Sequence, residues 1–144
     1  MIIIYLQSFI FSALGAFAVA KIMNTPGKMA YFAALIAACG FTLNTFLLGH
    51  IDNTISVFFA TMLIVVLAEI LARVFKYPAT IFIFPALTPL LPGVRLYQTI
   101  MSLTLGDIDA AFVTGGQTIL IALAIAMALV VTNTLARRYP IKDS

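Results

Sequence analysis

The sequence predicts an all-α integral membrane protein: a bundle of five transmembrane helices in a single domain, residues 1–144. Hydrophobic residues make up 63% of the chain and charged residues only 9%, whereas roughly a quarter of the residues in a soluble domain are charged. A soluble fold of this length leaves too many residues facing water to hide so much apolar surface. The apolar runs are continuous rather than alternating, which favours helices over the strands of a membrane β-barrel.

Five apolar stretches are long enough to cross a hydrocarbon core, which takes about 20 helical residues. Breakers and charged residues separate these stretches from one another. The first lacks a basic start and is too long for the apolar region of a signal peptide, so we expect it to be a mature helix. The five predicted spans are residues 2–22, 29–49, 55–74, 80–104 and 111–136.

The positions of Lys and Arg predict the orientation of the spans. If the N-terminus is outside, every Lys and Arg except Arg95 lies on the cytoplasmic side, as the positive-inside rule requires. Asp52, Asp107 and Asp109 then lie on the opposite side. We therefore expect an outside N-terminus and a cytoplasmic C-terminus. This topology accounts for the net charge of +3, so nucleic acid is not an expected partner.

The fourth stretch contains helix breakers where the others do not. Pro85, Pro89 and Pro92 lie inside it, and Gly93 follows directly. Each proline lacks an amide hydrogen and disfavours helical angles in the residue before it. We therefore expect the helix to be interrupted at the PLLPG segment, with its two pieces crossing as one discontinuous span. A re-entrant hairpin instead would place the cationic C-terminal end of the chain outside.

The piece after the break carries a polar stripe. Arg95, Gln98, Thr99 and Ser102 fall on one face at helical spacing. The free amides and the positive dipole end of this piece point into the break. A helix N-terminus beside a guanidinium is suited to binding an anion, and broken helices face the substrate in this way in many secondary transporters.

The same segment resembles a known family. The string Pro89-Leu90-Leu91-Pro92-Gly93 with Tyr97 downstream, then Gly106-Asp107 and a last helix rich in small residues, resembles the threonine/serine exporter (ThrE-like) family, in particular the small, YjjB-type membrane subunit of its split members. The resemblance covers essentially the whole chain in length and helix pattern, and its diagnostic part is residues 85–107. It implies an exporter in the bacterial inner membrane for threonine and serine or for dicarboxylates such as succinate, working with a larger partner subunit. The motif and the polar stripe together give the expected substrate-binding residues: Pro89, Pro92, Gly93, Arg95, Tyr97, Gln98 and Thr99.

Four further polar residues are candidates for the transport path or for coupling, and each has a structural alternative. Glu69 lies four residues before Arg73, so a helical ion pair competes with the role of a proton-linked carboxylate. Asp107 is expected to cap the last helix in preference to contacting substrate. Asn44 and Gln117 could line a path or could form hydrogen bonds between helices.

No metal site and no cofactor are expected. His50 has no second histidine or cysteine at ligand spacing, and Cys39 is the one cysteine of the chain. Ala30, Ala34 and Ala38 recur at every fourth position, as in helices that pack closely within a chain or against another subunit. Five spans without an internal repeat make a small transporter. We therefore expect a larger exporter-type subunit, further copies of the chain or both as partners, besides membrane lipid and a small-molecule substrate.

Two other classes of function remain open. A non-transporting membrane anchor or assembly subunit would have little need for three prolines and Arg95 inside a span. An intramembrane enzyme is not expected, because the chain has no HExxH motif, no paired aspartates within spans and no serine with a basic partner. The partner of Arg95 is open as well: it is either the substrate carboxylate or Glu69.

Overall fold

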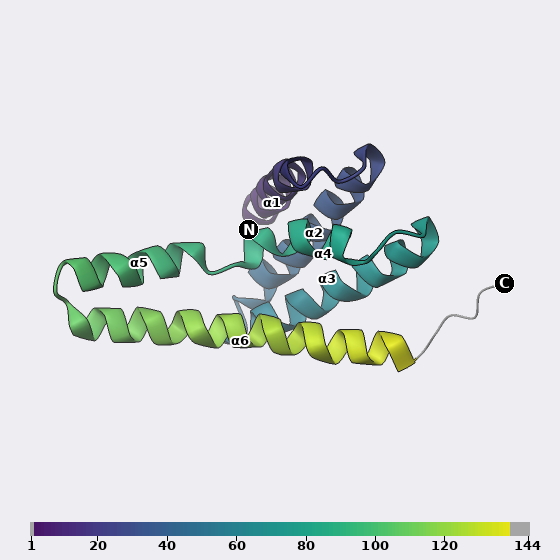
Figure 1. The fold of residues 1–144 in the computed structure, drawn as a ribbon. Coiled ribbons are helices and arrows are strands. Elements are labelled where there is room, and N and C mark those ends of the chain that lie inside the picture. The colour runs from purple at the N-terminus through teal and green to yellow at the C-terminus, as the bar shows by residue number, and fades with distance from the viewer. Residues whose placement is uncertain (1, 139–144) are drawn as a thin grey trace.

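In a computed structural model, residues 2–138 are described, and they form helices joined by short turns (Figure 1). Within this range there is no strand, so the predicted all-helical class is confirmed for it. Four helices are long and apolar enough to cross a membrane, and a fifth crossing results if the bent segment 80–104 counts as one. The elements are α1 (Ile2–Ile22), α2 (Gly27–Leu47), α3 (Asn53–Phe75), α4 (Thr80–Leu87), the short 3-10 helix η1 (Thr88–Leu90), α5 (Gly93–Thr104) and α6 (Ile108–Arg138).

Several helices begin a few residues earlier than predicted, because their first turns are set by residues outside the apolar runs. Pro26 precedes the first residue of α2. The Asp52 side chain accepts a hydrogen bond from the Thr54 amide at 3.1 Å, so α3 begins at residue 53 and not at 55. Asp107 accepts one from the Ala110 amide at 3.0 Å, so α6 begins at residue 108 and not at 111. The predicted capping by Asp107 is therefore confirmed.

The apolar core lies where α2, α3 and α4 meet. Phe82, Ile64 and Val65 are its largest fully buried apolar side chains. The predicted small-residue face of α2 is buried, with Ala30 and Ala38 at 0% exposure. Such small side chains let helix backbones approach closely. The remaining long helices join this core from two sides, α1 by packing on α2 and α6 by packing on α3.

The segment between α4 and α5 is not α-helical. The chain leaves α4 at Leu87, passes through η1 and resumes a helix at Gly93, and the two helical parts are bent by 51°. Leu91 has an extended backbone (ψ 134°), as expected for a residue before a proline. Pro85, by contrast, lies inside α4. The irregular backbone is therefore confined to the stretch that contains Pro89 and Pro92.

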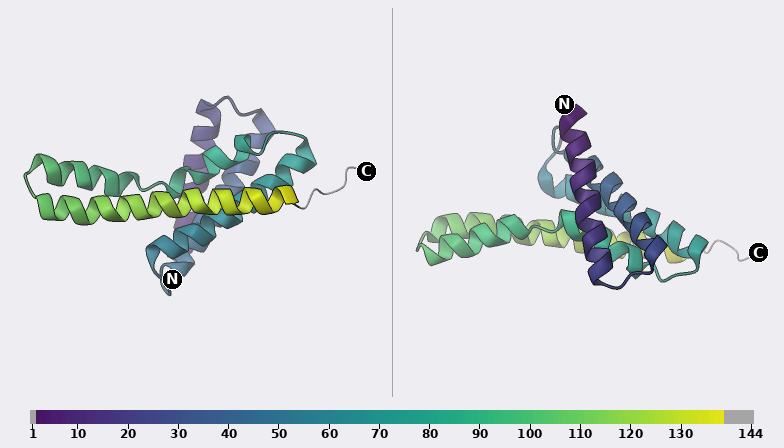
Figure 2. Two further views of the ribbon diagram at one scale, coloured as in Figure 1. Left: turned by 60° about the horizontal axis from the view of Figure 1, so that its bottom comes forward. Right: turned by 90° about the horizontal axis from the view of Figure 1, so that it is seen from above.

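A helical hairpin projects from the rest of the molecule. We call it the arm and define it as α5 together with residues 108–119 of α6. Its two helices run antiparallel and extend well beyond α1 to α4 (Figures 1 and 2). Gly106 (φ 78°) makes the turn between them, a backbone conformation that favours glycine. No residue of α5 is buried, and α5 packs mainly on α6.

Candidate functional site

A small polar cavity of about 170 Å³ lies at the irregular segment. At about 30 Å³ per water, it has room for roughly five water molecules or one small metabolite. Because the backbone leaves the helix here, elements that are far apart in sequence meet around it. Its walls are Asn44 from α2, Asn53 and Val57 from α3, residues 89–92, Val94 and Arg95 from α5, and Ile121 from α6.

Arg95 is half-buried at the edge of this cavity, where α5 meets α6. Its Nη1 donates a hydrogen bond to Oε1 of Gln117. A guanidinium has five N–H donors, so this bond leaves most of its donor capacity for other acceptors. Gln117 does not line the cavity and is connected to it only by this hydrogen bond to Arg95.

Glu69 is not the partner of Arg95. Its carboxylate lies 3.7 Å from the guanidinium of Arg73, one helical turn further along α3. This confirms the ion pair expected from the spacing of the two residues. Among residues 2–138 no acidic side chain forms a salt bridge with Arg95, so the alternative in which Glu69 neutralises Arg95 is wrong.

The first turn of α5, which contains the lining residues Val94 and Arg95, has two backbone amides without an acceptor in the described chain. Pro92 precedes the helix, and no side chain caps it. The Gly93 amide donates to the Leu91 carbonyl at 2.8 Å. The amides of Val94 and Arg95 have no acceptor among the residues that the structure describes. Unpaired amides at the positive end of a helix dipole attract anions, so the backbone and the guanidinium favour the same kind of ligand.

Asn44 forms the hydrogen bond between helices that was one of its two expected roles, and it also lines the cavity. Its buried side chain joins α2 to α3. Ser56 donates from Oγ to Oδ1 of Asn44, and the same Oγ lies 3.2 Å from the Asn44 backbone oxygen. With Oδ1 accepting from Ser56, the amide nitrogen of Asn44 keeps its two donor hydrogens. Ser56 was not a sequence candidate, because a serine in the first turn of an apolar helix carries no distinguishing signal.

The other expected substrate-binding residues lie beside the cavity and not in its wall. Thr99 Oγ1 lies 3.1 Å from Thr114 Oγ1 and 2.8 Å from the Arg95 carbonyl, so Thr99 joins α5 to α6. Gly115 permits this contact, because a Cβ there would lie 3.2 Å from Thr99 Cγ2. Tyr97 is exposed on α5.

Two further candidates are also separate from the cavity wall. Gln98 is exposed on α5, and Asp107 lies at the tip of the arm, where it caps α6. Gly93 is the first residue of α5 and adjoins the wall through its neighbours Pro92 and Val94. The structure therefore brings Pro89, Pro92 and Arg95 together with Asn44.

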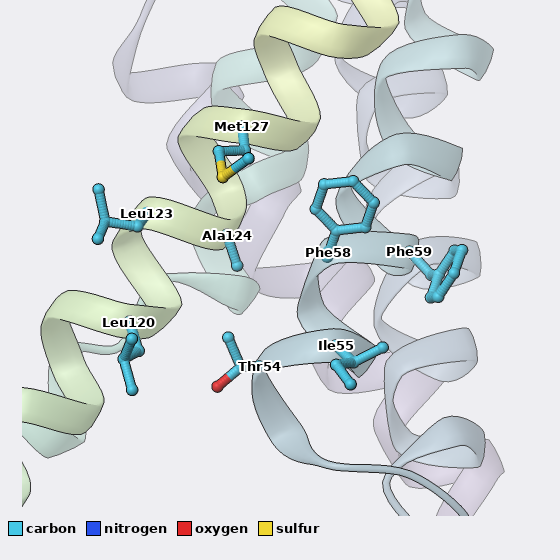
Figure 3. A pocket seen from close by; sticks show the side chains of 8 residues that line it. All are labelled: Thr54, Ile55, Phe58, Phe59, Leu120, Leu123, Ala124 and Met127. Atoms are coloured by element: carbon cyan, nitrogen blue, oxygen red, sulfur yellow. The ribbon is translucent and has the colours of Figure 1, made fainter.

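A larger cavity of about 520 Å³ is a different kind of site. It is an open groove between α3 and α6, and Figure 3 shows the side chains that line it: Thr54, Ile55, Phe58 and Phe59 from α3, and Leu120, Leu123, Ala124 and Met127 from α6. Its lining has no charged side chain. It therefore suits apolar groups such as lipid chains and offers an anion no positive charge. Within residues 2–138 no three His, Cys, Asp or Glu side chains lie close enough to hold a metal ion.

Comparison with known proteins identifies the family. A family model described as "Threonine/Serine exporter, ThrE" matches residues 8–135. A curated Haemophilus influenzae protein named "Uncharacterized protein" is 33% identical over 113 residues, a match that covers 74% of this chain and 38% of that protein. This chain thus spans less than two fifths of the relative's length, and no solved structure matches it. Because the family match covers nearly the whole sequence, the chain belongs to the threonine/serine exporter (ThrE) family.

Proposed function

We propose that this chain is a membrane subunit of an exporter of small carboxylate-bearing metabolites, namely threonine and serine or dicarboxylates such as succinate. Membership of the ThrE family supports membrane export. The observation that carries the proposal is the polar cavity at the irregular segment, whose lining residues include Arg95, Val94 and the buried Asn44. A non-transporting anchor would not need such a cavity.

In this proposal, α4, η1 and α5 cross the membrane as one discontinuous span. Residues 80–90 and 93–104 would each extend only about 17 Å at 1.5 Å per residue, less than the hydrocarbon core of about 30 Å. Irregular backbone at membrane depth is tolerated where it lines a wet cavity or is buried in protein. The cation distribution supports an outside N-terminus and a cytoplasmic C-terminus.

The geometry suggests how a carboxylate would be held. One substrate oxygen would accept from the Arg95 guanidinium, and the other from the amides of Val94 and Arg95 at the start of α5. Asn44 would donate from its amide nitrogen to a second polar group of the substrate, with Ser56 holding Oδ1 turned away. Gln117 would orient the Arg95 side chain. Charge-assisted hydrogen bonds of this kind are about twice as strong as neutral ones.

We further propose that a larger subunit completes the transporter in the bacterial inner membrane. Two observations support a partner. The described bundle is small for a complete transport machine, and the Haemophilus influenzae relative carries most of its length outside the matched region. Further copies of this chain could also contribute to the assembly.

Flux in proteoliposomes tests the proposed function. The chain is reconstituted with and without a candidate larger subunit, and uptake of labelled serine, threonine and succinate is measured. We expect saturable flux in the complete complex that unlabelled small carboxylates inhibit. The matched control is the methyl ester of the same compound (the dimethyl ester for succinate), which has no carboxylate and should inhibit poorly. Equal inhibition by acid and ester would contradict carboxylate binding at the cavity.

A further inference from the structure

The arm is suited neither to lipid alone nor to water alone. Its exposed surface is largely apolar: Val94 is 73% exposed, Leu105 72% and Phe112 78%. In water, this would be a large apolar patch of the kind that marks interaction sites. Yet the arm also presents Gln98 and Gln117 as exposed side chains and Arg95 as a half-exposed one. In lipid, such groups are costly unless protein or water covers them.

Gln98 is the polar side chain of the arm that fits least well in lipid. Its carboxamide makes no hydrogen bond with any residue that the structure describes, although Thr99 beside it is bonded to both Arg95 and Thr114. A lipid chain offers a carboxamide no hydrogen-bond partner. Tyr97, next to Gln98, is 66% exposed and combines an apolar ring with a polar tip. A covering surface must therefore supply both apolar contact and hydrogen-bonding groups.

The charges on the arm favour a covering segment different from this chain. Arg95 has no acidic partner among residues 2–138, because Glu69 pairs with Arg73 and Asp107 caps α6. A second copy that docked through the same face of α5 would supply no carboxylate there, because α5 contains no Asp or Glu. In the Haemophilus influenzae relative, moreover, the matched region is only 38% of the length, so most of that protein lies outside it.

We propose that the outer face of the arm around Tyr97 and Gln98 is a docking surface for a membrane helix that lies outside these 144 residues and presents carboxylate, carboxamide or hydroxyl groups. This docking surface is the place where the proposed larger subunit would bind, so the inference rests on the proposed function. It also gives a role to Tyr97 and Gln98, which do not line the cavity. Docking there would cover the open side of α5 and so exclude lipid from the neighbourhood of Arg95.

Photo-crosslinking in intact cells tests the docking surface. A benzophenone amino acid replaces Tyr97, a conservative exchange of one aromatic side chain for another. The control position is Phe11 on α1, which is 70% exposed and lies on a helix outside the arm. We expect position 97 to form a protein adduct whose attached peptide comes from a membrane helix outside this sequence and contains Asp, Glu, Asn, Gln, Ser or Thr. Position 11 should give at least fivefold less of that adduct.

A pair of substitutions tests the chemistry of the contact. Gln98→Leu should lower the yield of the position-97 adduct at least fivefold, whereas Gln98→Asn, which keeps the carboxamide, should retain most of it. An adduct with a second copy of this chain, adducts with lipid alone, or an unchanged yield in Gln98→Leu would each overturn the proposal.

The outcome is separable from that of the transport assay. The expected adducts without any carboxylate flux would contradict the proposed function and leave the docking surface standing. Normal carboxylate flux with adducts to lipid alone would contradict the docking surface and leave the proposed function standing.

Discussion

Replacing Gly40 with alanine should destabilise the fold, because α2 and α3 pack too closely at this position to admit a Cβ atom. A Cβ at this position would lie 2.5 Å from Cδ1 of Ile64 and closer still to Cγ1. Real Cβ atoms essentially never come within 3.0 Å of another heavy atom, and Ile64 is fully buried, so it has little room to move away. Overpacking of this kind typically costs about 1–3 kcal/mol.

Gly15 provides the matched control for this prediction. It also lies in the interior of a long helix, but a Cβ there would meet nothing within 4 Å. Both substitutions to alanine remove the helix penalty of glycine, about 0.5–1 kcal/mol. Gly15→Ala should therefore stabilise slightly, and the difference between the two variants isolates the overpacking cost of about 1–3 kcal/mol.

The assay is unfolding in mixed micelles with increasing SDS, followed by helical circular dichroism. In the Gly40→Ala background, Ile64→Ala should restore part of the loss, with a coupling of about 0.5–3 kcal/mol, because the two residues are in contact. Gly40→Ala with the same stability as Gly15→Ala would refute the close approach of α2 and α3. Since Asn44 lies one turn beyond Gly40, the same variant should also lower carboxylate flux.

Two further predictions concern topology and the ion pair of α3. Single cysteines at Asn53 and Asp109, in a Cys39→Ala background, should react with an impermeant reagent from outside; protection of both would contradict the proposed orientation. Glu69→Gln should change stability by less than about 1 kcal/mol, because the pair with Arg73 is partly exposed, and should leave the pH dependence of flux unchanged. A loss of proton-dependent flux in Glu69→Gln would instead assign a coupling role to this carboxylate.

The sequence was sufficient for the helical class. Continuous apolar runs can be satisfied in a membrane only by helices, so this signal is local. The role of Asp107 was predictable for the same reason, because a cap acts within one turn. Pro85 shows the limit of such reasoning, since α4 continues through it for two more residues.

What could not be predicted depends on contacts between helices. Nothing local distinguishes Ser56 from other hydroxyl residues, yet it holds the side chain of Asn44. The partner of Arg95 is Gln117, 22 residues further along the chain. Tyr97 and Gln98 lie within the family-like segment, but the direction in which α5 presents them depends on its packing against α6.

The central claim, that Arg95 binds the substrate carboxylate at the irregular segment, is tested most directly by flux and thermal stability measured together on Arg95 variants of the reconstituted complex. Losing a hydrogen bond to a charged group costs about 1.5–3 kcal/mol, which corresponds to roughly a 10- to 150-fold loss of apparent affinity. We predict that Arg95→Lys transports carboxylates at least tenfold less efficiently, because the two-pronged geometry is lost, and that Arg95→Gln abolishes transport, while both variants remain folded. A folded Arg95→Gln protein with normal carboxylate flux would contradict the account.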